Sequence, residues 1–123
     1  MPENNREGDM AEEPAFQHQH HLLTLPKSLD VMTVGPLEKE TLGLDVRAGQ
    51  DLILDMSAVE YVSSAGIRFL LMANSHWKKG GQATRIAGMC SNVEQTLKVC
   101  HLLHHFQVYA TVEDAVKSGS LSS

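Results

Sequence analysis

Residues 51–67 read Asp-Leu-Ile-Leu-Asp-Met-Ser-Ala-Val-Glu-Tyr-Val-Ser-Ser-Ala-Gly-Ile, and this stretch decides the fold. Leu52–Leu54 is an uninterrupted apolar run between two aspartates, which is typical of a strand that is covered on both faces. The chain then crosses a turn and reaches Ser63 and Ser64 at the start of a second apolar stretch. The pattern therefore predicts a buried strand, a turn and a buried helix that begins at a pair of serines.

The sequence around this stretch alternates between short apolar runs and segments of helical spacing. From Ser64 to Lys79 the apolar residues recur at helical intervals, and Gly80 and Gly81 follow as a C-terminal cap. Ser91 and Glu94 match a capping box that opens a further helix. The remaining predicted elements are strands at 22–25, 83–87 and 106–109 and helices at 30–46 and 111–118. This alternation predicts a single α/β domain, with a mixed sheet of about four strands and helices packed mainly on one face.

Charge is unevenly distributed along the 123 residues, whose formal net charge is −5. Residues 1–21 hold five acidic residues and one basic residue, and they show no sustained apolar period. Such a segment buries too little apolar surface to offset its ordering entropy. We therefore predict a flexible acidic tail at 1–21, a folded domain at 22–118 and a frayed C-terminus at 119–123.

Composition excludes several classes of protein. A mildly acidic chain with dispersed basic residues is a poor nucleic-acid binder. The longest mostly apolar run, 67–73, is far shorter than the roughly 20 residues that span a bilayer, so no direct membrane insertion is expected. Two cysteines make no disulfide scaffold and fit a reducing compartment. The sequence thus predicts a cytoplasmic domain.

The strand, the serine turn and the helix together closely resemble the STAS domain, the fold of the anti-sigma factor antagonists. The resemblance extends upstream to 29–33, where an aspartate and a threonine stand at the start of the first helix. Downstream, Gly80-Gly81 and the strand at 84–87 occupy the places of the family's paired glycine and next strand. The match covers residues 22–117, and it implies a protein-binding module in bacterial signal transduction.

The resemblance also implies a site. In the family, the serine two residues before the glycine of the turn accepts phosphate, and by position this residue is Ser64, two before Gly66. Because Ser63 stands where the best-known antagonists often have aspartate, Ser63 stays open as an alternative acceptor. The expected partner-binding residues around it are Asp30, Thr33, Tyr61, Val62, Ser63 and Arg68.

A phosphoserine at this position implies a partner switch that regulates transcription. The expected partner is a serine kinase that is also an anti-sigma factor, or a histidine-kinase-type signalling protein. It would bind the unmodified protein and release it after phosphorylation. The resemblance to short STAS proteins also implies an alternative, in which the chain is an unphosphorylated accessory subunit. It would belong to a chemotaxis-type signalling complex or to a lipid-transport ABC transporter. In the transporter its partner would be the ATPase subunit.

A hydrolase is the alternative from a different class. A serine at a strand-to-helix turn resembles a nucleophile elbow, but Val62 stands where the elbow needs glycine. His76, the only mid-chain histidine, falls three turns into the helix and makes no evident acid–histidine pair with the serines. His18, His20 and His21 lack cysteine or carboxylate ligands at set spacing. We therefore expect no enzyme activity, no cofactor and no metal.

Overall fold

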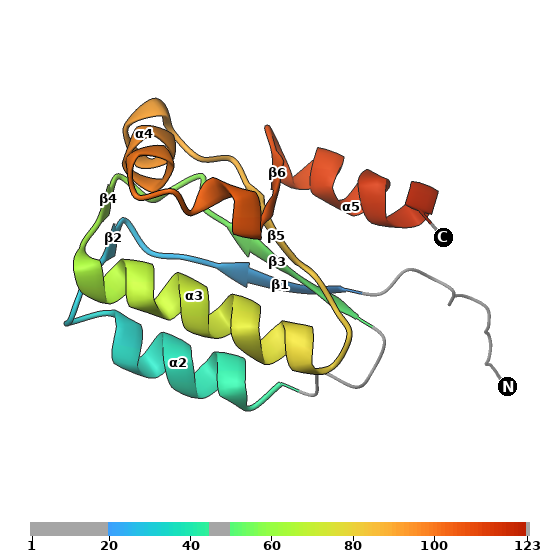
Figure 1. The fold of residues 1–123 in the computed structure, drawn as a ribbon, viewed down its shortest axis with the longest axis horizontal. Coiled ribbons are helices and arrows are strands. Elements are labelled where there is room, and N and C mark those ends of the chain that lie inside the picture. Colours follow the sequence, from blue (N-terminus) through green and yellow to red (C-terminus); the bar gives the residue numbers. More distant parts are fainter. Residues whose placement is uncertain (1–19, 45–49, 123) are drawn as a thin grey trace, which may run out of the picture.

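Four parallel strands form the sheet at the centre of the fold (Figure 1). The computed structural model describes residues 20–44 and 50–122. The strands are β1 (His20–Thr24), β3 (Asp51–Asp55), β5 (Thr84–Ala87) and β6 (Gln107–Tyr109), in the order β1-β3-β5-β6. The α/β class and the strand number are confirmed, but each of the three pairings is parallel, where a mixed sheet was expected.

Strand β3 is central because its apolar run is buried on both faces. Leu52, Ile53 and Leu54 are all fully buried, as the sequence pattern predicted. Leu52 and Leu54 join the main hydrophobic core, whereas Ile53 belongs to a second cluster with Ala87 and Ala115. The sheet is therefore covered on both sides.

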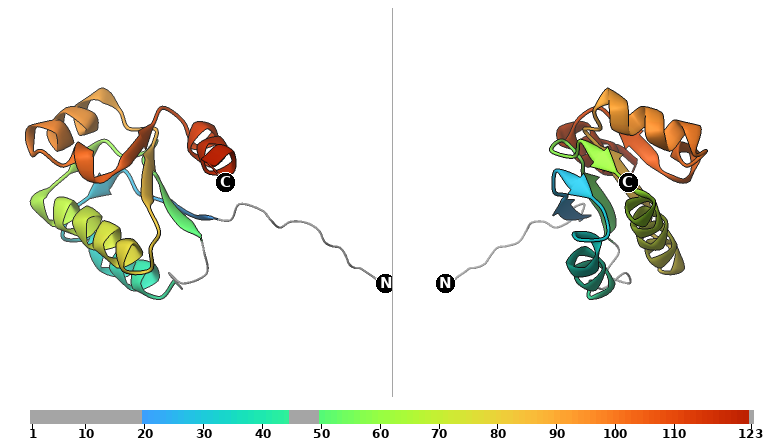
Figure 2. Two further views of the ribbon diagram at one scale, coloured as in Figure 1. Left: turned by 45° about the vertical axis from the view of Figure 1, so that its right-hand side comes forward. Right: turned by 90° about the vertical axis from the view of Figure 1, so that its left-hand side faces the viewer.

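Helices α2 (Val34–Leu42) and α3 (Ser64–Lys79) cover the main-core face of the sheet. They lie side by side there, and α4 (Ser91–Val99) packs at one end of this layer (Figures 1 and 2). Helix α5 (Val112–Ser122) packs against β3 and β5 through Ala115 on the opposite face. A short 3-10 turn, η3 (Leu103–His105), precedes β6. Most of the helices thus lie on one face, as expected.

A second, two-stranded sheet positions the functional site. Strand β2 (Ser28–Leu29) pairs in parallel with β4 (Tyr61–Val62), with Leu29 opposite Val62. Both side chains are buried in the main core. Residues far apart in the sequence, those after Leu29 and those after Val62, are thereby brought together.

Several element boundaries differ from the sequence prediction. Strand β1 begins at His20, so the two last residues of the predicted tail at 1–21 belong to the sheet, and the rest of that tail lies outside the described residues. Helix α2 begins at Val34 instead of residue 30, because residues 30–33 form a hydrogen-bonded turn. Helix α5 continues to Ser122, beyond the predicted end of the domain at 118 and through most of the segment expected to fray.

The predicted capping box is also wrong. Helix α4 begins at Ser91, with Cys90 as its N-cap and no side-chain cap hydrogen bond. Ser91 is therefore the first helical residue and not the cap. By contrast, α3 runs from Ser64 to Lys79 as predicted, and Gly81 follows at φ +78°, a left-handed conformation that glycine adopts without strain.

Candidate functional site

Two turns meet at the end of the β2–β4 pair. Asp30 directly follows β2, and Ser63 and Ser64 directly follow β4. Strands β2 and β4 lie beside the start of α3 (Figure 1). The Ser63 N–H donates to the Leu29 carbonyl over 2.8 Å, which ties the two turns to each other. The parallel pairing therefore places the predicted aspartate beside the predicted serines.

Ser63 is committed to the architecture of the turn. It is the N-cap of α3, and its Oγ accepts a hydrogen bond from the Gly66 N–H at 3.3 Å. The same hydroxyl donates to the Leu29 carbonyl at 3.1 Å. The hydroxyl is partly buried and uses both its donor and an acceptor position, so modifying it would break the cap.

Ser64 differs from its neighbour in every one of these respects. It is the first residue of α3, its side chain is exposed, and its hydroxyl has no hydrogen bond to any described residue. The first-turn N–H groups of a helix carry a partial positive charge, which favours an added anion at this position. Of the two predicted acceptors, Ser64 is the one whose hydroxyl is accessible.

Gly66 permits the close approach of α3 to β2. A Cβ at this position would lie 2.5 Å from the Leu29 carbonyl oxygen and 2.9 Å from Cγ1 of Val62. No side chain fits in that space. The Ser-x-x-Gly spacing at 63–66 is therefore a packing requirement of the turn as well as a sequence motif.

Asp30 organises the neighbouring turn. Its carboxylate accepts hydrogen bonds from the Ser28 hydroxyl and from the Met32 N–H, each at 2.9 Å. These bonds, that from Ser28 first, hold the pKa of the Asp30 carboxyl below its ordinary value. Asp30 is therefore ionised at neutral pH and presents a fixed negative charge beside the serine turn.

Thr33 braces the same turn from within. Its hydroxyl accepts from the Asp30 N–H at 3.0 Å and donates to the Ser28 carbonyl at 2.8 Å. It is the N-cap residue of α2 but makes no side-chain cap hydrogen bond to that helix. Its contribution to the site is the shape of the turn that holds Asp30.

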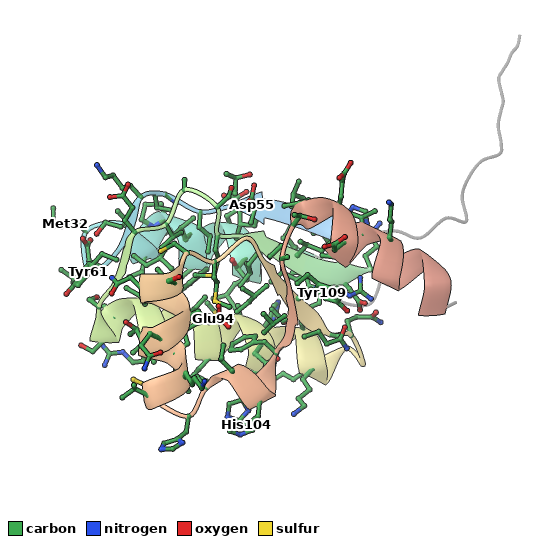
Figure 3. The ribbon with its side chains drawn as sticks, turned by 90° about the horizontal axis from the view of Figure 1, so that it is seen from above. Met32, Asp55, Tyr61, Glu94, His104 and Tyr109 are labelled. Atoms are coloured by element: carbon green, nitrogen blue, oxygen red, sulfur yellow. The ribbon has the colours of Figure 1, made fainter. Side chains whose placement is uncertain are left out.

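Exposed apolar side chains surround the two turns. Val31, Met32 and Tyr61 are 76%, 83% and 55% exposed, and Figure 3 shows Met32 and Tyr61 together at one end of the molecule. Tyr61 was predicted from the sequence, but Val31 and Met32 were missed. The sequence prediction placed both residues inside the helix at 30–46, whereas in the structure they precede α2, which begins at Val34. We call Val31, Met32, Tyr61, Ser64 and Arg68 the Ser64 surface.

The two remaining predicted residues have opposite environments. Val62 is 7% exposed and packs in the main core, so it supports the Ser64 surface from beneath. Arg68 is exposed on α3, four residues after Ser64. Residues four apart lie on the same face of a helix, so the Arg68 guanidinium is within reach of a group attached to Ser64.

The geometry argues against a hydrolytic triad at Ser64. His76 lies twelve residues further along the same helix, about 18 Å away by helical rise. Its Nε2 is buried and has no hydrogen-bond partner in the part of the chain that the structure describes. His76 therefore cannot reach the Ser64 hydroxyl as a base.

Residues 20–44 and 50–122 offer neither a metal centre nor a membrane-spanning helix. Among these residues no group of three or more histidine, cysteine, aspartate and glutamate side chains is arranged to hold a metal ion. None of the helices in this part of the chain has the length and apolar character needed to cross a bilayer.

Comparison with known proteins identifies the family. A sequence model of the STAS domain matches residues 13–115. An anti-sigma-factor antagonist (STAS) domain protein from Planctomyces limnophilus is 17% identical, with a TM-score of 0.73 over 85% of this chain and 95% of that one. A candidate anti-sigma factor antagonist from Thermotoga maritima is 16% identical, with a TM-score of 0.72 over 85% and 92% of the two chains. A sulfate transporter family protein from Wolinella succinogenes is 16% identical, with a TM-score of 0.71 over 82% and 84%. The chain belongs to the STAS domain family.

Proposed function

We propose that this chain is a cytoplasmic, non-catalytic protein-binding module that acts as an anti-sigma factor antagonist and is switched by phosphorylation of Ser64. The observation that carries the proposal is the exposed hydroxyl of Ser64 at the N-terminus of α3, next to exposed apolar side chains. The partner is a serine kinase that also acts as an anti-sigma factor. It binds the unmodified Ser64 surface and releases it after phosphate transfer. The released kinase is then free to bind its sigma factor again.

The switch is electrostatic and local. A phosphate adds roughly −1.5 to −2 charge at pH 7 and three acceptor oxygens. The α3 dipole and Arg68 accommodate that charge within this chain, so the fold survives the modification. A partner surface shaped around a neutral hydroxyl and beside the Asp30 carboxylate would instead lose affinity through desolvation and repulsion.

The direct test is phosphorylation by the serine kinase encoded nearest to the gene for this protein. After incubation with ATP, mass spectrometry should locate one phosphate on Ser64. Ser64→Ala should abolish the modification, whereas Ser63→Ala should retain it. Phosphate on Ser63, or on neither serine, would overturn the assignment of the acceptor.

Binding to the same kinase tests the switch itself. In isothermal titration calorimetry, Ser64→Ala should bind the kinase with the affinity of the unmodified protein. Ser64→Asp should bind at least about tenfold more weakly, because like charges brought together at an interface cost several kcal/mol. Ser91→Asp is the matched control, since Ser91 is also an exposed first residue of a helix. Equal affinities for Ser64→Asp and Ser91→Asp would refute the electrostatic switch.

The exposed apolar side chains favour a second candidate function. Val31, Met32 and Tyr61 offer binding energy that does not depend on the charge state of a serine. On this alternative the chain is a constitutive subunit of a chemotaxis-type signalling complex or of a transporter, bound there to the ATPase subunit. It predicts a stable complex that Met32→Ser weakens and that Ser64→Asp leaves intact.

A further inference from the structure

Strand β6 forms an outer edge of the main sheet, and its far side has no partner strand among the residues that the structure describes. In the described part of the chain β6 pairs only with β5, and the Gly88 N–H donates to the Tyr109 carbonyl at 3.1 Å. Tyr109 therefore directs its carbonyl toward β5. Since successive residues of a strand direct their N–H and C=O groups to opposite sides, Val108 directs both of its groups away from the sheet.

The residue before β6 extends this open edge. Phe106 has an extended backbone, with φ −126° and ψ 156°, so the same alternation directs its carbonyl outward. Among the described residues, no backbone hydrogen bond of a turn, loop or helix cap uses the Phe106 carbonyl. None of these bonds uses the N–H or the C=O of Val108 either. Residues 106–111, Phe-Gln-Val-Tyr-Ala-Thr, also contain no charged residue and no proline, which are two of the features that protect edge strands from pairing.

A pocket adjoins this open edge. It has a volume of about 320 Å³ and is lined by Met89, Glu94, Val108, Tyr109 and Ala110. The Val108 side chain is 40% exposed there. Figure 3 shows that Glu94 comes from α4 and Tyr109 from β6, away from Met32 and Tyr61. The pocket is thus separate from the Ser64 surface.

Glu94 gives the pocket its charge. Its side chain is exposed in the first turn of α4 and forms no ion pair with any residue that the structure describes. Met89, Val108 and Ala110 provide apolar walls next to it. The site therefore combines open strand hydrogen bonds, an apolar recess and one uncompensated negative charge.

We propose that the β6 edge binds an extended segment of a partner protein, which pairs with Val108 as an added strand. This segment places an apolar side chain in the pocket and a lysine or arginine against Glu94. The chain's own residues 1–21 carry five acidic residues and one basic residue, so Glu94 disfavours them as the occupant. A second copy would bring its own Glu94 to the same interface, where the two carboxylates repel each other.

The first experiment uses a synthetic peptide as the probe. The capped peptide Ser-Lys-Val-Thr-Val-Lys-Ser is titrated into the isotopically labelled full chain and followed by NMR. Saturable shift changes are expected at Val108, Met89 and Glu94, together with slower hydrogen exchange of the Val108 amide. Changes that cluster instead at Met32 and Tyr61, or the absence of saturable changes, would overturn the proposal.

Variants separate the backbone contribution from the charge. Val108→Pro removes the outward N–H without removing a bond to β5, and edge strands tolerate proline in this position. We expect it to weaken peptide binding by about three- to tenfold, as for the loss of one hydrogen bond. Glu94→Gln should weaken binding by about two- to fivefold, as for an exposed ion pair, whereas Glu113→Gln on α5 should leave it unchanged.

A charge swap decides the case even if the proline variant fails to fold. Glu94→Lys should prefer the same peptide with glutamate in place of lysine, and the unaltered protein should show the reverse preference. Absence of this swap would overturn the role of Glu94. Sedimentation equilibrium should show that both the unaltered chain and Glu94→Gln are monomers. A dimer that Glu94→Gln strengthens would assign the edge to a second copy.

Discussion

At the scale of single residues, the hydroxyl groups of Ser63 and Ser64 differ in their hydrogen bonds. The Ser63 hydroxyl caps α3 and bonds to Leu29, whereas the Ser64 hydroxyl bonds to no described side chain or backbone group. We predict that Ser63→Ala lowers the free energy of unfolding by about 1–2 kcal/mol, the usual cost of a lost cap. Ser64→Ala should change it by less than about 0.5 kcal/mol. Urea denaturation of both variants measures the difference, and equal losses would contradict these roles.

The Asp30 turn predicts a local dependence on pH. Hydrogen bonds from Ser28 and Met32 hold the Asp30 pKa below its ordinary value of 3.8. The charged form therefore stabilises the turn at pH values above the unfolded pKa, and this contribution is lost as the pH falls through the folded pKa. An NMR titration should show the Met32 amide resonance moving only in this strongly acidic range. In Asp30→Asn the acid-induced movement should disappear, and a movement that persists would have another origin.

At the scale of elements, the contact between α3 and β2 depends on a missing side chain. Gly66→Ala would place a Cβ 2.5 Å from the Leu29 carbonyl oxygen, so the helix start must shift. We expect a loss of about 1–3 kcal/mol in the free energy of unfolding, as for other overpacked sites. Gly35→Ala on α2 is the matched control, because apart from its neighbours in the chain and the backbone of its own helix no described atom lies within 4 Å of its Cβ. The helix-propensity gain of alanine is opposed by Pro36, which disfavours the helical conformation of the residue before it, so the free energy of unfolding should change by less than about 1 kcal/mol, and thermal unfolding compares the two variants.

The accuracy of the sequence prediction differed among elements for identifiable reasons. The periodicity and glycines around α3 predicted its bounds because packing, start and stop signals agree there. The start of α2 was placed too early, because the side-chain bonds of Asp30 and Thr33 favour a turn that competes with the helix. The α4 capping box failed because the helix begins one residue before the pattern requires, and Cys90 takes the cap position.

At the scale of the whole molecule, the site depends on pairings that a linear sequence does not display. The motif predicted Ser64 and Asp30, but only the β2–β4 register explains why they are neighbours. Val62 was grouped with the surface because it is close in sequence, yet its strand position directs it into the core. Val31 and Met32 were missed because the predicted helix at 30–46 included them, whereas the structure places them in the turn before α2. The parallel direction of the four main strands likewise depends on which distant strands pair with each other.

One arginine connects three strands of the main sheet, and its loss should have a global effect. Arg85 on β5 is buried, pairs with Asp51 on β3, and donates from Nε to Gln107 on β6 at 3.2 Å. Arg85→Leu leaves the Asp51 carboxylate partly buried without its counter-charge, which costs about 3–5 kcal/mol.

This loss is a large share of the roughly 5–15 kcal/mol that stabilises a typical domain, so the cooperative unfolding midpoint should fall sharply in circular-dichroism melts. Asp51 also accepts a bond from the Ala83 N–H at 2.9 Å, which asparagine preserves. The double variant Asp51→Asn with Arg85→Leu should therefore recover much of the lost stability, because no unpaired charge remains. If the double variant is no more stable than Arg85→Leu alone, the loss arises from packing around the arginine stem and not from the stranded carboxylate.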